Sequence, residues 1–189
     1  MQIRSQTFFE SGKTLCGLSL VFAVILTVTG CVSPPGARRI ANPVIAGRAV
    51  SLENILVAVT SSAGDLTAEK NLLGDALVSG LNQTEMFASV SRNRADLIAG
   101  NGITIRADIK SIKRVSDDAR AWTGALAGSA QLVLRVSIAD LQSGQPIEFF
   151  DVEGRSGASA YAGTTDEAIQ EAVRPIVAEV LKLNSQTSQ

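Results

Sequence analysis

Few residues in this 189-residue chain could perform covalent chemistry. The sequence has two cysteines, Cys16 and Cys31, and no histidine. The lack of histidine excludes Ser-His-Asp and Cys-His catalysis and any His-ligated metal site. Two cysteines are also too few for a disulfide-rich scaffold. The thiol of Cys31 is therefore the nucleophile whose sequence surroundings are most informative.

Cys31 follows a short apolar segment without charges, Thr14–Val28. As a helix this segment would reach about 22 Å at roughly 1.5 Å per residue, short of a bilayer core of about 30 Å. A leader that carries Arg4 and Lys13 precedes it. A basic leader followed by a short apolar core is typical of a secretory signal, which we predict over residues 1–30.

The four residues Val28, Thr29, Gly30 and Cys31 resemble the lipobox of bacterial lipoproteins, in which an aliphatic residue and two small residues precede a cysteine. The resemblance implies signal cleavage between Gly30 and Cys31, a diacylglycerol thioether on the Cys31 sulfur and an acyl chain such as palmitate on the new amino group. Several acyl chains anchor a protein durably, because each buried methylene contributes about 0.8 kcal/mol. The alternative is a buried cysteine at the end of a hydrophobic helix.

The residue after Cys31 is Val32 rather than aspartate. This resembles the sorting pattern of lipoproteins that reach the periplasmic face of the outer membrane. A plasma-membrane lipoprotein of a Gram-positive cell would have the same pattern, so both locations stay open.

Paired acids are the remaining candidates for catalysis. Asp117 and Asp118 are adjacent, so on a strand they would point to opposite faces, whereas Asp151 and Glu153 would share a face. Two carboxylates supply too few oxygens for a typical calcium site. We therefore expect no catalytic residue, metal or cofactor, and keep a carboxylate- or lysine-based hydrolase as an alternative.

Three other features could contact a ligand or partner. The glycine-rich run Gly154–Gly163 leads into a predicted helix and could cradle an anion or simply connect two elements. The single tryptophan lies among small residues, where it could dock on a partner or fold onto the sheet. The segment Ser91–Arg120 carries a net charge of +3, which indicates either an anionic partner or charges paired across strands. The candidate partner contacts are Trp122, Lys110, Lys113 and Arg114.

Hydrophobic periodicity predicts an α+β domain of order β-α-β-β-β-β-α. Its sheet would be mixed and mostly antiparallel, with four or five strands and with two helices on one face. The predicted strands are Asn54–Thr60, Met86–Ser91, Ala95–Val115, Ser129–Ala139 and Pro146–Gly154, and the predicted helices are Asp65–Leu81 and Thr165–Leu183. In the second helix, Thr164 and Glu167 match a capping box, and Pro175 predicts a kink or a break.

Composition divides the chain into four parts. Residues 1–30 are the predicted signal peptide, and residues 31–51 are the lipidated cysteine with a linker rich in proline and glycine. Residues 52–183 form the predicted α/β lipoprotein domain, and residues 184–189 form a disordered tail.

The domain resembles bacterial lipoproteins of the domain-of-unknown-function 4410 type. The likeness lies in Val133–Asp140, the Ser143-Gly144 turn, Val152–Gly154 with the glycine-rich run after it, and Thr164–Ile169. It implies a small envelope lipoprotein without an established activity or site residues.

We therefore predict a lipid-anchored periplasmic module that binds a partner and does not catalyse a reaction. An accessory role in a secretion, lipid-transport or peptidoglycan-synthesis complex is the alternative. The expected partners are the membrane, through the acyl chains on Cys31, and an unidentified envelope protein or cell-wall component. A net charge of −1 gives no general attraction to nucleic acid.

Overall fold

The computed structural model describes residues 36–41, 52–115, 128–157 and 163–187. The chain divides into two compact units, Met1–Cys31 and Val32–Gln189, and all described residues belong to the second. In these described ranges, no helix has both the length and the apolar character needed to cross a membrane. The predicted signal peptide, lipobox and Trp122 lie outside the described residues, so those predictions stay predictions.

Six strands form one mixed sheet in the order β1-β6-β5-β4-β2-β3. Strand β2 runs parallel to β3 and β4, and the other neighbouring pairs are antiparallel. This confirms the predicted α+β class and element order. The elements are β1 (Gly36–Ala41), β2 (Asn54–Ser61), α2 (Thr67–Asn82), β3 (Ser89–Ser91), the 3-10 turn η1 (Arg94–Asp96), β4 (Gly102–Lys113), β5 (Gln131–Asp140), β6 (Pro146–Arg155) and α4 (Thr165–Thr187).

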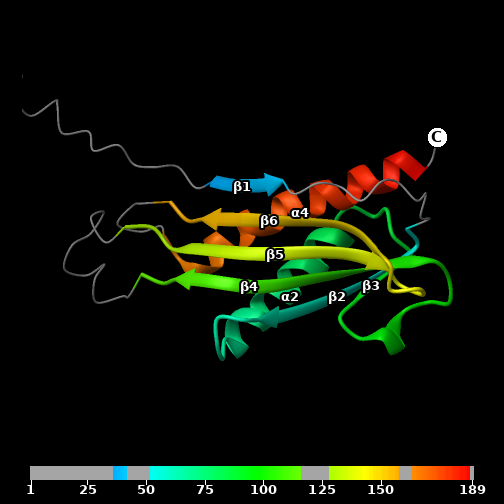
Figure 1. The fold of residues 1–189 in the computed structure, drawn as a ribbon, viewed down its shortest axis with the longest axis horizontal. Coiled ribbons are helices and arrows are strands. Elements are labelled where there is room, and N and C mark those ends of the chain that lie inside the picture. The colour runs from blue at the N-terminus through cyan, green and yellow to red at the C-terminus, as the bar shows by residue number, and fades with distance from the viewer. Residues whose placement is uncertain (1–35, 42–51, 116–127, 158–162, 188–189) are drawn as a thin grey trace, which may run out of the picture. The chain divides into compact units, whose positions relative to one another are not determined.

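Helices α2 and α4 cover one face of the sheet, as Figure 1 shows. Successive side chains of the central strands point to opposite faces of the sheet, so every second side chain points toward the helices. The core side chains are apolar and almost fully buried, among them Ile105 on β4, Leu134 on β5 and Phe150 on β6. Gly154 lies where α4 approaches β6 closely, because an added Cβ would come within 2.1 Å of the Ala168 carbonyl oxygen.

Strand β1 is an element that the sequence analysis did not predict. It lies within the segment expected to be a linker and pairs antiparallel with β6, from Gly36 opposite Arg155 to Ala41 opposite Phe150. The segment has no apolar periodicity in the sequence, and its strand lies at the edge of the sheet.

Other elements also differ from the prediction. Helix α4 ends at Thr187, so it extends into the segment 184–189 that was predicted to be a disordered tail. Strand β4 begins at Gly102, and the preceding residues form η1 and a loop, where the sequence suggested an interrupted strand. Helix α4 continues across Pro175 as one helix and is not broken there. Its predicted cap is confirmed, since the Glu167 amide donates to Thr164 Oγ1 at 3.1 Å. The Glu167 carboxylate in turn accepts from the Gly163 amide at 2.9 Å.

Candidate binding surface on the outer face of the sheet

The face of the sheet opposite α2 and α4, called the outer face here, carries the polar side chains of the central strands. Arg106 on β4 lies directly opposite Ser137 on β5, and Ser137 lies opposite Phe149 on β6. Two residues further along, Asp108, Arg135 and Asp151 form the next row. Strand pairing therefore brings side chains from three strands into ordered rows.

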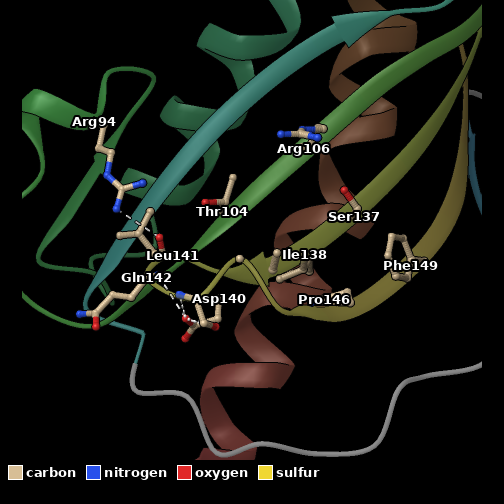
Figure 2. Close-up of a pocket in the computed structure, with 13 residues that line it drawn as sticks. Arg94, Thr104, Arg106, Ser137, Ile138, Asp140, Leu141, Gln142, Pro146 and Phe149 are labelled. Carbon is tan, nitrogen blue, oxygen red and sulfur yellow. Dashed lines mark hydrogen bonds between the residues drawn. The ribbon is translucent and has the colours of Figure 1, made fainter.

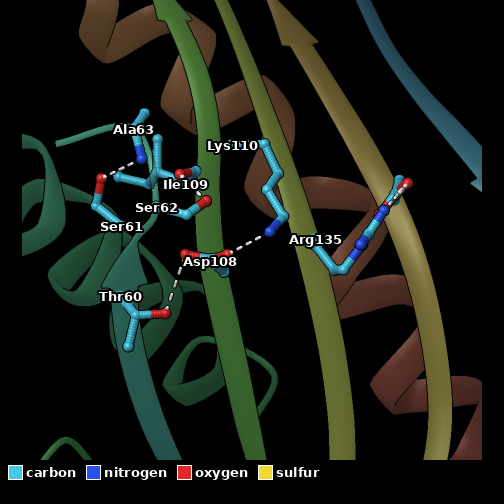
Figure 3. A network of polar contacts seen from close by, with 9 residues as sticks. Thr60, Ser61, Ser62, Ala63, Asp108, Ile109, Lys110 and Arg135 are labelled. Carbon is cyan, nitrogen blue, oxygen red and sulfur yellow. Dashed lines mark hydrogen bonds and ion pairs between the residues drawn. The ribbon is translucent and has the colours of Figure 1, made fainter.

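The second row is a ladder of paired charges (Figure 3). Asp108 accepts a hydrogen bond from Thr60 Oγ1 at 3.2 Å and pairs with Lys110 Nζ at 2.8 Å. Arg135 donates from Nε and Nη2 to the two oxygens of Asp151, at 3.0 and 3.3 Å. Each charge in this row therefore has an opposite charge beside it.

These contacts shift two ionisation equilibria. The hydrogen bond from Lys110 holds the pKa of the Asp108 carboxyl below its ordinary value of 3.8. Ser62 and Thr60 act in the same direction, and partial burial opposes them. On the neighbouring strand, the hydrogen bond to Asp151 raises the pKa of Arg135. Both shifts favour the charged forms and so preserve the ladder.

Of the acids considered for catalysis, Asp117 and Asp118 lie outside the described residues, and Asp151 and Glu153 do not form a shared acidic site. Asp151 is held by Arg135, and Glu153 pairs with Arg155 and accepts from Gln131 Nε2 at 2.6 Å. Throughout the described ranges, no group of three or more histidine, cysteine, aspartate or glutamate residues could hold a metal ion.

A groove of about 530 Å³ opens on the outer face beside the first row. Figure 2 shows Arg106, Ser137 and Phe149 on the three strands β4, β5 and β6, with Arg94 in η1. Phe149 is 37% exposed, although large apolar side chains are usually buried. The groove lining is Arg94, Thr104, Arg106, Ser137, Ile138, Ala139, Asp140, Leu141, Gln142, Ser143, Gly144, Pro146 and Phe149.

The β5–β6 turn forms one end of the groove. Asp140 Oδ1 accepts from the Gln142 amide, the Ser143 amide and Ser143 Oγ at 3.1, 2.6 and 2.7 Å. Gly144 has a φ of +68°, which favours glycine. Gln142 Nε2 donates to the Gly100 carbonyl at 3.3 Å and so ties the turn to the loop before β4. This end of the groove is thus fixed by hydrogen bonds, and the Asp140 carboxylate is engaged in the turn.

The groove arginines differ from the other arginines whose side chains the structure describes. Arg92, Arg114, Arg135, Arg155 and Arg174 each form an ion pair with an acid. The other two, Arg94 and Arg106, both line the groove. Arg94 Nη2 donates to the Leu141 carbonyl at 3.3 Å. Within the described part of the chain, no side chain pairs with Arg106, which is exposed.

The candidate partner contacts of β4 are not gathered on one surface. Lys110 belongs to the outer face through its ion pair with Asp108. Arg114 reaches the helix side, where Nε donates to Glu69 Oε1 of α2 at 2.8 Å. Lys113 is exposed at the end of β4. The charge-rich segment is thus divided between both sides of the sheet.

Arg94 and Arg106 belong to the basic segment Ser91–Arg120 for which an anionic partner was considered, whereas Phe149 was not singled out from the sequence. One local signal nevertheless marks it. Phe149 and Phe150 are adjacent, and two aromatic residues in succession on a strand must point to opposite faces. One of them therefore had to lie on the outer face. No such signal places Arg94 beside Arg106 in the groove. Their proximity depends on the path of the chain between η1 and β4.

No family model and no curated protein matches this chain. Several solved structures match this chain at low sequence identity and low TM-score. A PelC variant, solved as a dodecamer, from Paraburkholderia phytofirmans is 10% identical, with 75% of this chain and 97% of that chain covered and a TM-score of 0.45. A DUF330 protein from Xanthomonas campestris is 17% identical, with 82% and 98% covered and a TM-score of 0.48.

A candidate lipoprotein from Caulobacter crescentus is 15% identical, with 69% of this chain and 90% of that chain covered and a TM-score of 0.36. The identities and TM-scores are too low to transfer a function. The resemblance to the domain-of-unknown-function 4410 type stays a prediction.

Proposed function

We propose that this protein is a lipid-anchored accessory module of the bacterial cell envelope that binds a partner on the outer face of its sheet. One observation supports the binding role above the others. The outer face carries an open groove whose lining includes an exposed aromatic ring, Phe149, and two arginines that have no acidic partner in the described ranges. Burial of such groups in an interface would release ordered water and satisfy the unpaired charges.

Strand β1 supports an oriented attachment to the membrane. Four residues separate Cys31 from Gly36, so at about 3.6 Å per residue their Cα atoms are at most about 18 Å apart. Gly36 lies opposite Arg155, at the end of β6. A lipid on Cys31 would therefore keep this end of the sheet near the bilayer. Phe149 in the groove lies six residues from Arg155 along β6, which is about 20 Å at roughly 3.3 Å per residue.

The ion pairs on the outer face favour binding over a carboxylate hydrolase. A hydrolase would need an acid free to exchange a proton beside a substrate pocket. Asp151 and Glu153 are both held by arginines, and neither belongs to the groove lining. We accordingly propose a non-catalytic role, serving a secretion, lipid-transport or peptidoglycan-synthesis complex.

The anchor is tested by metabolic labelling with radioactive palmitate. We expect the Cys31→Ser variant to lose the label and to retain its uncleaved signal, because no thioether can form at serine. Cys16→Ser is the matched control and should keep the label. Undiminished labelling of Cys31→Ser would contradict a lipid on Cys31.

The binding role is tested by photo-crosslinking in intact cells. Benzoylphenylalanine would replace Val133, which lies on the outer face of β5, and in a second strain Trp122. The control position is Leu72, which is 45% exposed on α2. We expect a discrete adduct from Val133 or Trp122 and none from Leu72. Equal or absent capture at all three positions would contradict a partner on the outer face.

A further inference from the structure

We propose that the groove binds an extended peptide segment of a partner protein, one that carries carboxylates beside an aliphatic or aromatic side chain. This inference rests on the proposed function and specifies the chemistry of its partner. It depends on the two groove arginines, on Phe149 and on the spacing between them.

The arginines define the charged half of the ligand. Five other arginines with described side chains are neutralised by an acid, whereas Arg94 and Arg106 have no acidic partner among the described residues. The one acid of the groove lining, Asp140, is engaged by the turn. A guanidinium pairs with a carboxylate through two parallel hydrogen bonds. Carboxylates of the ligand would supply the missing partners.

Phe149 and Pro146 define the apolar half of the ligand. Both line the groove, and the Phe149 ring is 37% exposed. Inorganic phosphate has no apolar surface to place against an aromatic ring. A peptide offers both kinds of group on one chain, and an aliphatic or aromatic side chain on Phe149 would bury apolar area worth about 25 cal/mol per Å².

Strand register gives the spacing. Arg106 and Phe149 are separated by one strand, and Ser137 stands between them. At about 4.8 Å between neighbouring strands, the two Cα atoms lie about 10 Å apart. Three residues of extended peptide span about the same length. Successive side chains of an extended peptide point to opposite sides, so two groups that both face the groove must stand an even number of residues apart. Because an arginine side chain extends well beyond its Cα, the preferred segment should place an acid four residues from its apolar side chain.

Fluorescence anisotropy with the full chain in detergent micelles tests this inference. The probe is the fluorescein-labelled peptide Gly-Glu-Glu-Ser-Ser-Leu-Gly. Its controls replace both glutamates by glutamine, replace leucine by serine, or place leucine directly after the acids. We expect saturable binding of the probe, with at least tenfold weaker binding of the glutamine control and several-fold weaker binding of the other two.

Protein variants locate the site. Arg106→Gln and Arg94→Gln together should weaken probe binding at least tenfold, and Phe149→Ser should weaken it several-fold. Arg92→Gln is matched in chemistry, but its ion pair with Asp75 lies outside the groove, and it should leave binding unchanged. Circular dichroism of each variant verifies that the fold is retained. Equal effects of Arg92→Gln and Arg106→Gln would overturn the assignment.

Two further probes distinguish other anions. Sodium phosphate and phosphatidylglycerol vesicles should each fail to displace the peptide at matched ionic strength. No saturable binding of the acidic peptide, or arginine-dependent binding of phosphate or vesicles in its place, would overturn the inference. Retained palmitate labelling and a Val133 adduct would then show that the proposed function stands while the ligand class is wrong.

Discussion

Phe149 and Phe150 are adjacent on β6 and lie on opposite faces of the sheet. Phe150 is completely buried under α4, and Phe149 is 37% exposed in the groove. The same side-chain type therefore has a structural role at one position and is available for binding at the next.

This pair gives the first prediction. Phe150→Ala should lower the free energy of unfolding by about 3–5 kcal/mol, because it leaves a cavity in a close-packed core. Phe149→Ala should change it by no more than about 1 kcal/mol. Urea unfolding of the full chain, followed by circular dichroism, measures both. A similar loss from the two variants would contradict the assigned faces.

Gly154 gives a second prediction, on the contact between α4 and β6. A Cβ at this position would lie 2.1 Å from the Ala168 carbonyl oxygen and 2.8 Å from the Ala172 Cβ. Gly154→Ala should therefore cost about 3 kcal/mol, at the upper end of the range for overpacked cores. Gly144→Ala is the control, since its added methyl meets open space and only its φ of +68° is strained, at about 1–2 kcal/mol. Equal urea midpoints for the two variants would argue against the close approach.

The third prediction concerns pH and the charged ladder. The pKa of Asp108 is lower in the folded protein than its ordinary value of 3.8. Its contribution to stability is therefore present above about pH 4 and is lost as the pH falls through the folded-state value. Asp108→Asn should lower stability at about pH 7, and its difference from the parent chain should shrink as the pH falls below 3.8.

Lys110→Met serves as the companion variant in the same measurement, because it removes the partner that lowers the Asp108 pKa most. Both variants should show a flatter loss of stability on acidification than the parent chain. If both variants lost as much stability on acidification as the parent chain, the groups whose protonation destabilises the protein would not include Asp108.

Arg114 gives a fourth prediction, which separates a structural role from a binding role. Its ion pair is with Glu69 of α2, whose side chain is only 11% exposed. Arg114→Met should lower the free energy of unfolding by about 1 kcal/mol, because it leaves the carboxylate unpaired. Glu69→Gln combined with Arg114→Met should recover part of this loss, as a double-mutant cycle would show.

Partner capture is the second readout for Arg114. The variant should yield the same crosslinked adduct from Val133 as the parent chain. Unchanged stability together with a lost adduct would identify Arg114 as a contact residue after all.

The fifth prediction concerns β1. Replacement of Gly36–Ala41 by alternating glycine and serine should weaken its pairing with β6, since both residues disfavour strands. Hydrogen exchange of peptides from β6 should then become faster, while peptides from the central strand β4 keep their protection. Unchanged exchange in β6 would contradict the strand pairing from Gly36 to Ala41.

The sequence by itself determined the main elements and the α+β class. The alternation in β4, β5 and β6 and the helical period of α2 and α4 arise from neighbours close in the chain, so they can be read locally. The capping box at Thr164 was predictable for the same reason. The signal segment, the lipobox and Trp122 are likewise sequence predictions, on which the described residues have no bearing.

Which side chains are neighbours on the outer face follows from the tertiary structure and not from the local sequence. The row of Arg106, Ser137 and Phe149 depends on the register of three strands, and β1 became a strand only because the edge of β6 offered it partners. The separation of Lys110 from Arg114 likewise follows the register shift between Ile109 and Ser111. Register is set by contacts between residues far apart in the chain, and a one-residue slip moves a side chain to the opposite face. A local pattern therefore predicts a strand, but the surface that the strands form together requires the fold.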